Sequence, residues 1–313
     1  MIPLAAEGLE FINAKPDEVI DYLESLERSK LQINPSNLKV YLDGKTMVLS
    51  VMNKNVEDYP IRKSFFYKLL KWYSFPMNQL YRLSNETVVS ICNDYLMNIN
   101  REYVNVTLEK GEALTITSPD YNEITDLEVI KKCTDLGVRT VSRNDFMLRI
   151  TTEEEFKFEP IPGDACGIGL NVINSETGFR SLSIAHFVMR YTCSNGAIVT
   201  ISNDDKERVH YGYKEYELQE FLAEQVKLAL LSQKEVADSL KKFSNKRAAD
   251  YVNSVNKRVE SYLGKYESKN FFGELKEEST LYDLFNVVTN NAKKYDLGKR
   301  VLLENLAGDL ILN

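Results

Sequence analysis

The chain has 313 residues, of which 43% are apolar and 27% are charged, and its formal net charge at pH 7 is −7. This length and composition are sufficient for a large core and exclude a disordered chain. The acidic balance argues against a protein that binds polyanions over its whole surface, because such proteins are usually basic, but it leaves room for a local basic patch.

The first 55 residues are expected to form a helix and a β-hairpin. Residues 8–30 show the apolar spacing of a helix, with Pro16 in a first turn. Two strand-like runs, 38–42 and 46–51, flank the pair Asp43-Gly44, which favours a tight reversal between antiparallel strands.

Residues 56–213 are expected to form an α+β core with an antiparallel sheet. Helical patterns cover 61–70, a segment that starts after Pro76, 86–98, and 126–136, which stops at Gly137. Strands are predicted at 103–108, 114–117, 139–142, 146–151, 171–175, 181–187, 189–193 and 197–202. Residues 153–163, with two prolines, are predicted to be a polar loop.

Residues 214–313 are expected to be helical. The stretch 215–263 contains neither proline nor glycine, and further amphipathic patterns cover 280–294 and 297–312. The predicted fold class is therefore α+β, with N-terminal helices, an antiparallel strand-rich centre and a long C-terminal helical region.

The central segment resembles a known family. Asn174-Ser175-Glu176-Thr177-Gly178 is followed by Phe187 to Gly196, FVMRYTCSNG. This succession is similar to the domain-of-unknown-function 932 family, the phage/plasmid-like proteins of bacterial mobile elements. Fainter similarities at 75–96, at Arg208-Val209-His210 and at 284–289 extend the resemblance over roughly residues 60–305. The resemblance implies a phage or plasmid gene in a bacterial cell and assigns no catalytic residue.

Motifs for cofactors and metals are missing from the sequence. There is no Walker motif, and Gly167-Ile168-Gly169 lacks the third glycine of a dinucleotide fingerprint. The spacing of His186 and Cys193 is not that of a zinc site. We therefore expect no cofactor and no metal, and a Cys193–His210 nucleophile pair has no sequence signature. A nuclease or hydrolase remains a third alternative, with a site around Glu176, Arg180, Arg190 and His210.

The cysteines indicate a reducing compartment. Cys92, Cys133, Cys166 and Cys193 are scattered without a CxxC pair, which favours buried free thiols. The first residues do not form a signal peptide, and no apolar run approaches the ~18 residues of a membrane span. A cytoplasmic protein without a membrane partner is expected.

The strongest binding signal is local charge. Between residues 241 and 269 there are eight basic and three acidic residues, with Tyr251, Tyr262 and Tyr266 interleaved. Binding of single-stranded nucleic acid requires cations that neutralise phosphates and aromatic rings that stack on bases. The alternative is an amphipathic helix whose tyrosines face the core. The predicted nucleic-acid-binding residues are Arg180, Arg190, His210, Lys241, Lys242, Lys246, Arg247, Tyr251, Lys257 and Arg258.

Two further features have both a functional and a structural interpretation. Ser175, Thr177 and Gly178 are candidates for a backbone nest that holds a phosphate beside Arg180, or simply for a turn satisfied by its own hydroxyls. A smaller basic face combines lysines and aromatic residues and is equally typical of a half-buried helix; it comprises Arg62, Lys63, Phe65, Phe66, Tyr67, Lys68, Lys71, Trp72 and Tyr73.

These features predict a non-catalytic nucleic-acid-binding protein that binds or anneals single-stranded DNA in recombination or replication. An antiparallel sheet crossed by a long helix resembles, in outline, the single-strand annealing proteins that form rings, so self-association is expected. The alternative is a protein-interaction factor, for counter-defence or host takeover, whose partner is a host or phage protein. The net acidic charge suits this second function.

Overall fold

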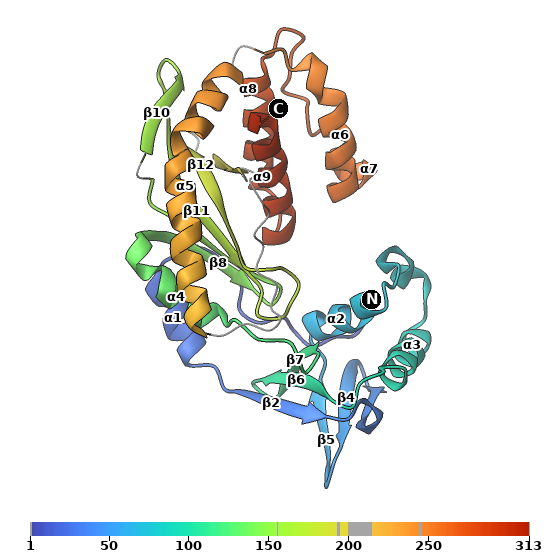
Figure 1. The fold of residues 1–313 in the computed structure, drawn as a ribbon. Coiled ribbons are helices and arrows are strands. Elements are labelled where there is room, and N and C mark those ends of the chain that lie inside the picture. Colours follow the sequence, from blue (N-terminus) through green and yellow to red (C-terminus); the bar gives the residue numbers. More distant parts are fainter. Residues whose placement is uncertain (1, 155, 193–194, 200–214, 244–245, 313) are drawn as a thin grey trace.

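The chain folds into three antiparallel sheets and their covering helices, which confirms the predicted α+β class (Figure 1). The computed structural model describes residues 2–154, 156–192, 195–199, 215–243 and 246–312. Within these residues, no helix is long and apolar enough to cross a membrane.

The largest sheet has the strand order β1-β8-β9-β11-β12-β13, and β10 pairs with β11 beside this path. Its strands are β1 (Phe11–Ala14), β8 (Val138–Asn144), β9 (Met147–Thr152), β10 (Phe156–Ile161), β11 (Asp164–Asn174), β12 (Ser183–Arg190) and β13 (Asn195–Val199). Side chains alternate between its two faces. Val172 belongs to a core that includes residues of α1 (Pro16–Glu24), α4 (Asp126–Cys133) and α5 (Glu215–Phe243), whereas Ile173 packs with the start of α9 (Leu297–Leu312).

Two smaller sheets share a second core. One contains β2 (Arg28–Ile33), β6 (Val104–Glu109) and β7 (Glu112–Thr117), and the other β3 (Leu38–Asp43), β4 (Thr46–Met52) and β5 (Val56–Pro60). They pack with α2 (Lys63–Trp72), the 3₁₀ helix η2 (Met77–Arg82), α3 (Asn85–Met97) and the 3₁₀ turn η1 (Pro35–Asn37). The expected domain boundary at residue 55 falls between β4 and β5, which are hydrogen-bonded neighbours.

The remaining helices cover the large sheet directly or pack beyond the helices that cover it. They are α1 (Pro16–Glu24), α4 (Asp126–Cys133) with the 3₁₀ turn η3 (Thr134–Leu136), α5 (Glu215–Phe243), α6 (Ala249–Leu263), α7 (Lys265–Ser268), α8 (Leu281–Ala292) and α9 (Leu297–Leu312). The helices that pack beyond the others are α6 and α7. The long α5 lies against β10, β11 and β12, while α9 lies against β13 (Figure 1). A buried ion pair of 2.6 Å between Arg149 Nη2 on β9 and Glu304 Oε2 on α9 ties this helix to the sheet.

Two of the predicted elements are wrong. Residues 11–14 and 28–30, expected within one helix, belong to the strands β1 and β2, because Pro16 occupies the first turn of α1 and the flanking residues pair with β8 and β6. The predicted loop at 153–163 contains β10. Pro160 is tolerated there because β10 pairs on one side only, with β11, and a register shift lies between Phe158 and Ile161.

Candidate nucleic-acid interface

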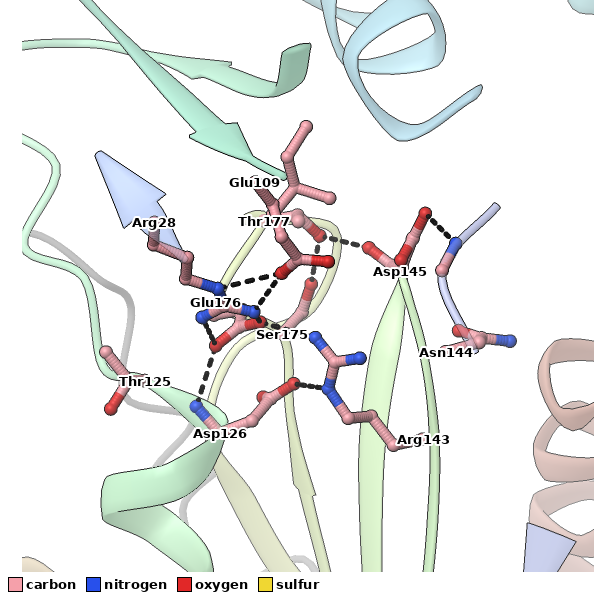
Figure 2. A network of polar contacts seen from close by, with 12 residues as sticks. Arg28, Glu109, Thr125, Asp126, Arg143, Asn144, Asp145, Ser175, Glu176 and Thr177 are labelled. Carbon is pink, nitrogen blue, oxygen red and sulfur yellow. Dashed lines mark hydrogen bonds and ion pairs between the residues drawn. The ribbon is translucent and has the colours of Figure 1, made fainter. Parts of the chain in front are cut away.

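The Ser-Glu-Thr-Gly turn follows β11 and is the centre of a buried polar network (Figure 2). Its Glu176 is only 4% exposed. The Glu176 carboxylate accepts hydrogen bonds from Arg28 Nη2 at 2.6 Å, from Arg143 Nη2 at 2.7 Å and from the backbone N–H of Asp126 at 3.0 Å. The turn therefore joins β2, β8 and the first turn of α4.

The network shifts the pKa values of its two central carboxyl groups, those of Glu176 and Asp126, in opposite directions. Burial alone would raise the pKa of Glu176, but the guanidinium groups of Arg143 and Arg28 outweigh that cost and hold the pKa well below its ordinary value. Asp126 accepts from Arg143 Nε at 3.0 Å, yet its burial and the Glu176 charge raise its pKa. Glu176 is consequently the ionised anchor of the site.

The network continues into the smaller sheets. Arg28 Nε donates to Glu109 at 2.8 Å, and Arg62, which precedes α2, donates to Glu109 at 2.7 Å and to Glu112 at 2.6 Å. Arg62 Nη1 also lies 3.4 Å from Asp145, in the turn between β8 and β9. These contacts connect the large sheet with the β2-β6-β7 sheet and with α2.

The hydroxyls of the predicted phosphate nest are engaged inside the protein. Ser175 Oγ accepts from the N–H of Phe179 at 3.0 Å, and Thr177 Oγ1 donates to the Asp145 carbonyl at 2.8 Å. Both residues are buried, and Gly178 adopts the positive φ of 78° that completes the turn. The geometry favours the structural interpretation of Ser175 and Thr177.

Part of the smaller basic face lines a cavity among the described residues. Lys63, Tyr67 and Lys71 are four residues apart on α2, so their side chains share one side of the helix. This side lines a cavity of about 1350 Å³. The other lining residues come from the N-terminal segment, from the region of η2 and from the turn after β11: Ile2, Leu4, Ala5, Glu7, Ser74, Phe75, Met77, Leu80, Tyr81, Leu83, Asn85 and Phe179.

The Phe179 ring, next to the Ser-Glu-Thr-Gly turn, lies between that turn and the cavity beside α2. Lys68 Nζ lies 5.6 Å and Lys71 Nζ 5.7 Å from its centroid, and Lys68 Nζ also donates to the Gly178 carbonyl at 2.5 Å. Burial, together with the neighbouring Lys71 charge, lowers the pKa of Lys68 to about 8. Sequence reasoning did not single out Phe179; its position directly after the turn glycine was the available signal.

Two predicted arginines lie at opposite ends of β12. Arg180 is half-buried and follows Phe179 in the chain. Arg190, at the end of β12, donates from Nε to the Asp164 carboxylate oxygens at 2.8 and 2.6 Å, and its guanidinium lies 5.9 Å from the Tyr282 ring centroid. The structure thus places Arg180 next to the cavity-lining Phe179 along the chain and Arg190 away from it, beside α8.

The C-terminal basic residues are spread over two helices and the segment between them. Lys241 and Lys242 are exposed in the last turn of α5, Lys246 and Arg247 lie between α5 and α6, and Lys257 and Arg258 are on α6. In Figure 1, α8 and α9 lie between α5 and α6. Arg258 donates to Asp309 at 2.6 Å.

The α6 tyrosines do not form a free stacking surface. Tyr251 and Tyr262 pack partly buried against the core shared by α5, α6, α8 and α9. Tyr266 on α7, in contrast, is 93% exposed. The amphipathic interpretation therefore fits Tyr251 and Tyr262, while Tyr266 stays available for contacts.

Among the groups considered for catalysis, Arg180 and Arg190 are half-buried, and the others are enclosed or outside the described residues. Glu176 is saturated by its guanidinium partners, and His210 and Cys193 lie outside the described residues. His186 is buried, with Nε2 at 2.7 Å from the Ala229 carbonyl of α5. Cys92, Cys133 and Cys166 are buried free thiols, and burial raises the pKa of Cys92 and Cys133 to about 12.

No cluster of three metal-ligating side chains occurs in the part of the chain that the structure describes. Comparison with known proteins gives no match to a family model, to a curated protein or to a solved structure.

Proposed function

We propose that the chain is a non-catalytic nucleic-acid-binding protein of a phage or plasmid, which holds single-stranded DNA during recombination or replication in the cytoplasm of a bacterial host. The single observation that carries this proposal is the α2 cavity. It combines cations and aromatic rings in one concave surface next to the Ser-Glu-Thr-Gly turn.

Both requirements of single-strand binding are represented there. The exposed Tyr81 and the half-buried Phe179 supply rings for stacking, and Lys63 and Lys71 supply charge for the sugar-phosphate backbone. Tyr67 and Phe75 also line the cavity, but they are partly packed against the second core. Glu7 contributes the opposite charge and lies 2.8 Å from Lys63 Nζ. A phosphate that approaches Lys63 would compete with this exposed ion pair, which is inexpensive to break.

The large sheet gives a second, weaker line of support. Its antiparallel strands are crossed by α5, a helix of 29 residues, as in the outline of ring-forming annealing proteins. The proposal therefore includes self-association of the chain, which analytical ultracentrifugation with and without an oligonucleotide would test.

The direct test is fluorescence anisotropy with a labelled oligothymidine at low and moderate salt. We expect salt-sensitive binding by the intact chain. Phe179→Ala should weaken it by about 1–3 kcal/mol, the usual value for the loss of one stacking ring. Tyr266→Ala is the matched control, because this exposed ring lies on α7, and it should bind like the parent. Absence of binding at low salt would eliminate the proposal.

The alternative, a protein-interaction factor, is favoured by a groove between α4 and α5. This groove of about 720 Å³ is lined by Leu230 and Leu231 and by lysines including Lys132 and Lys227. Leu231 is 74% exposed, and apolar surface rimmed by charge is typical of protein contacts. Affinity capture from the host with the parent chain and with Leu231→Glu tests this function: a protein retained by the parent alone would support it.

A further inference from the structure

Lys68 and Lys71 form a pair of like charges on a single ring. Their ammonium nitrogens lie 5.6 and 5.7 Å from the centroid of Phe179, and Lys68 Nζ lies 5.9 Å from the Tyr121 ring as well. Cation–π contacts compensate part of the lost hydration, but two neighbouring ammonium groups repel each other, and Lys68 is half-buried.

The ammonium groups of this pair contact rings and a backbone carbonyl instead of a carboxylate. Lys63 on the same helix, in contrast, places its Nζ 2.8 Å from Glu7 Oε1. In the described part of the chain, no carboxylate lies within ion-pair distance of Lys68 or Lys71, and the hydrogen bond of Lys68 goes to the Gly178 carbonyl. Lys68 is half-buried and Lys71 is exposed, so the desolvation cost falls on Lys68, and an anion that contacts both groups would offset it.

The spacing of the two lysines on α2 makes the pair suitable for a phosphate. Lys68 is three residues before Lys71 on α2, and the Gly178 carbonyl orients its ammonium group. Lysine binds phosphate as a point charge with rotatable donors, and each charge-assisted hydrogen bond is stronger than a neutral one. Lys71 and Phe179 also line the α2 cavity, whose aromatic rings can receive the base next to that phosphate.

We propose that Lys68 and Lys71 bind a phosphomonoester over the Phe179 ring, and that this group is the terminal phosphate of the strand in the α2 cavity. A phosphomonoester carries a charge of about −1.5 to −2 at pH 7, which matches two ammonium groups, whereas an internal phosphodiester carries one negative charge. The inference rests on the proposed function, since it names the part of the strand that this site recognises.

The experiment compares oligothymidines that carry a 5′-phosphate, a 3′-phosphate or no terminal phosphate, by anisotropy with the intact chain. We expect one of the phosphorylated strands to bind about tenfold more tightly than the unphosphorylated one. Lys68→Met and Lys71→Met should each abolish this preference, while Lys39→Met, which removes an exposed lysine of β3, should retain it. Equal affinities of the three strands would overturn the inference and leave the proposed function intact.

A second measurement separates the phosphate site from strand binding. Trp72, the single tryptophan, follows Lys71 in α2, so its fluorescence can report titration with inorganic phosphate or deoxythymidine monophosphate. If the nucleotide binds saturably and binding requires Lys68, but no strand binds, the phosphate site is supported and its ligand is a free nucleotide. The same result would reject the strand-binding function. No response to either probe, together with equal strand affinities, would reject the phosphate site.

The variants also have an internal check for folding. Because Lys68→Met removes a cation whose desolvation is compensated only in part by the Gly178 carbonyl and the two rings, the unliganded variant should unfold at the same urea concentration as the parent or at a higher one. If Lys68→Met unfolds at a lower urea concentration than the parent, Lys68 has a structural role. In that case Lys68→Arg, which keeps the charge, must restore both the stability and the preference for a terminal phosphate; failure to restore the preference would reject the phosphate site.

Discussion

Replacement of Arg143 by methionine tests the role of the buried network. Arg143 is 1% exposed and donates to Asp126 at 3.0 Å and to Glu176 at 2.7 Å. The loss of Arg143 leaves the buried carboxylates of Asp126 and Glu176 without its guanidinium group. Arg28 then remains as the guanidinium partner of Glu176. Breaking one side of a buried pair costs about 3–5 kcal/mol, a large share of the roughly 5–15 kcal/mol by which folded proteins are stable.

Urea unfolding at pH 7 measures this cost. Arg101→Met is the matched control, because Arg101 forms an exposed pair with Asp120 at 2.8 Å and should lose at most about 1 kcal/mol. The two variants should differ in urea midpoint at similar m-values. If Arg143→Met unfolds at the same urea concentration as Arg101→Met, the network does not hold the sheets together.

The same variant has a predicted pH dependence. In the folded protein the guanidinium charges outweigh the effect of burial and lower the pKa of Glu176. The ionised Glu176 therefore stabilises the fold at pH values above the ordinary pKa of a glutamate, and this stabilisation is lost as the pH falls below that ordinary value. Removal of Arg143 weakens that contribution. The difference in unfolding free energy between parent and Arg143→Met should therefore be smaller near pH 4 than at pH 7.

Two further predictions concern other parts of the chain. In a thermal unfolding assay, Gly308→Ala on α9 should destabilise the protein by at least about 1–3 kcal/mol, because the new Cβ would lie 1.8 Å from the Ile198 carbonyl oxygen. Gly273→Ala is the control and should be nearly neutral in the same assay. The pKa of Lys68 is lowered by burial and by Lys71 to about 8, so the parent should gain stability relative to Lys68→Met as pH rises from 8 towards 10.5; a constant difference would refute this.

Local signals were sufficient for many elements of the fold. Asp43-Gly44 correctly predicts the β3–β4 hairpin, in which Asp43 pairs with Thr46. Gly137 ends the helical stretch at 136 with a φ of 67°. Where the prediction failed, at residues 11–14 and at β10, pairing with a distant strand overrode the local pattern.

The candidate site was less accessible to sequence reasoning. The mixture of lysines and aromatic residues at 62–73 was visible, but its partner Phe179 comes from a turn more than a hundred positions later, since Lys68 and Gly178 are 110 residues apart. Likewise, nothing near Glu176 in the chain indicated that Arg28 and Arg143 would enclose it. Such long-range contacts are set by tertiary packing, which periodicity and turn motifs do not encode.

Strand binding in the α2 cavity is tested most directly by photochemical crosslinking of an iododeoxyuridine-substituted oligonucleotide to the intact chain, followed by mass spectrometry of the modified peptides. We expect adducts at Tyr67, Tyr81 or Phe179, the rings of the α2 cavity. Adducts confined to Tyr251, Tyr262 or Tyr266 in the C-terminal helices would contradict it.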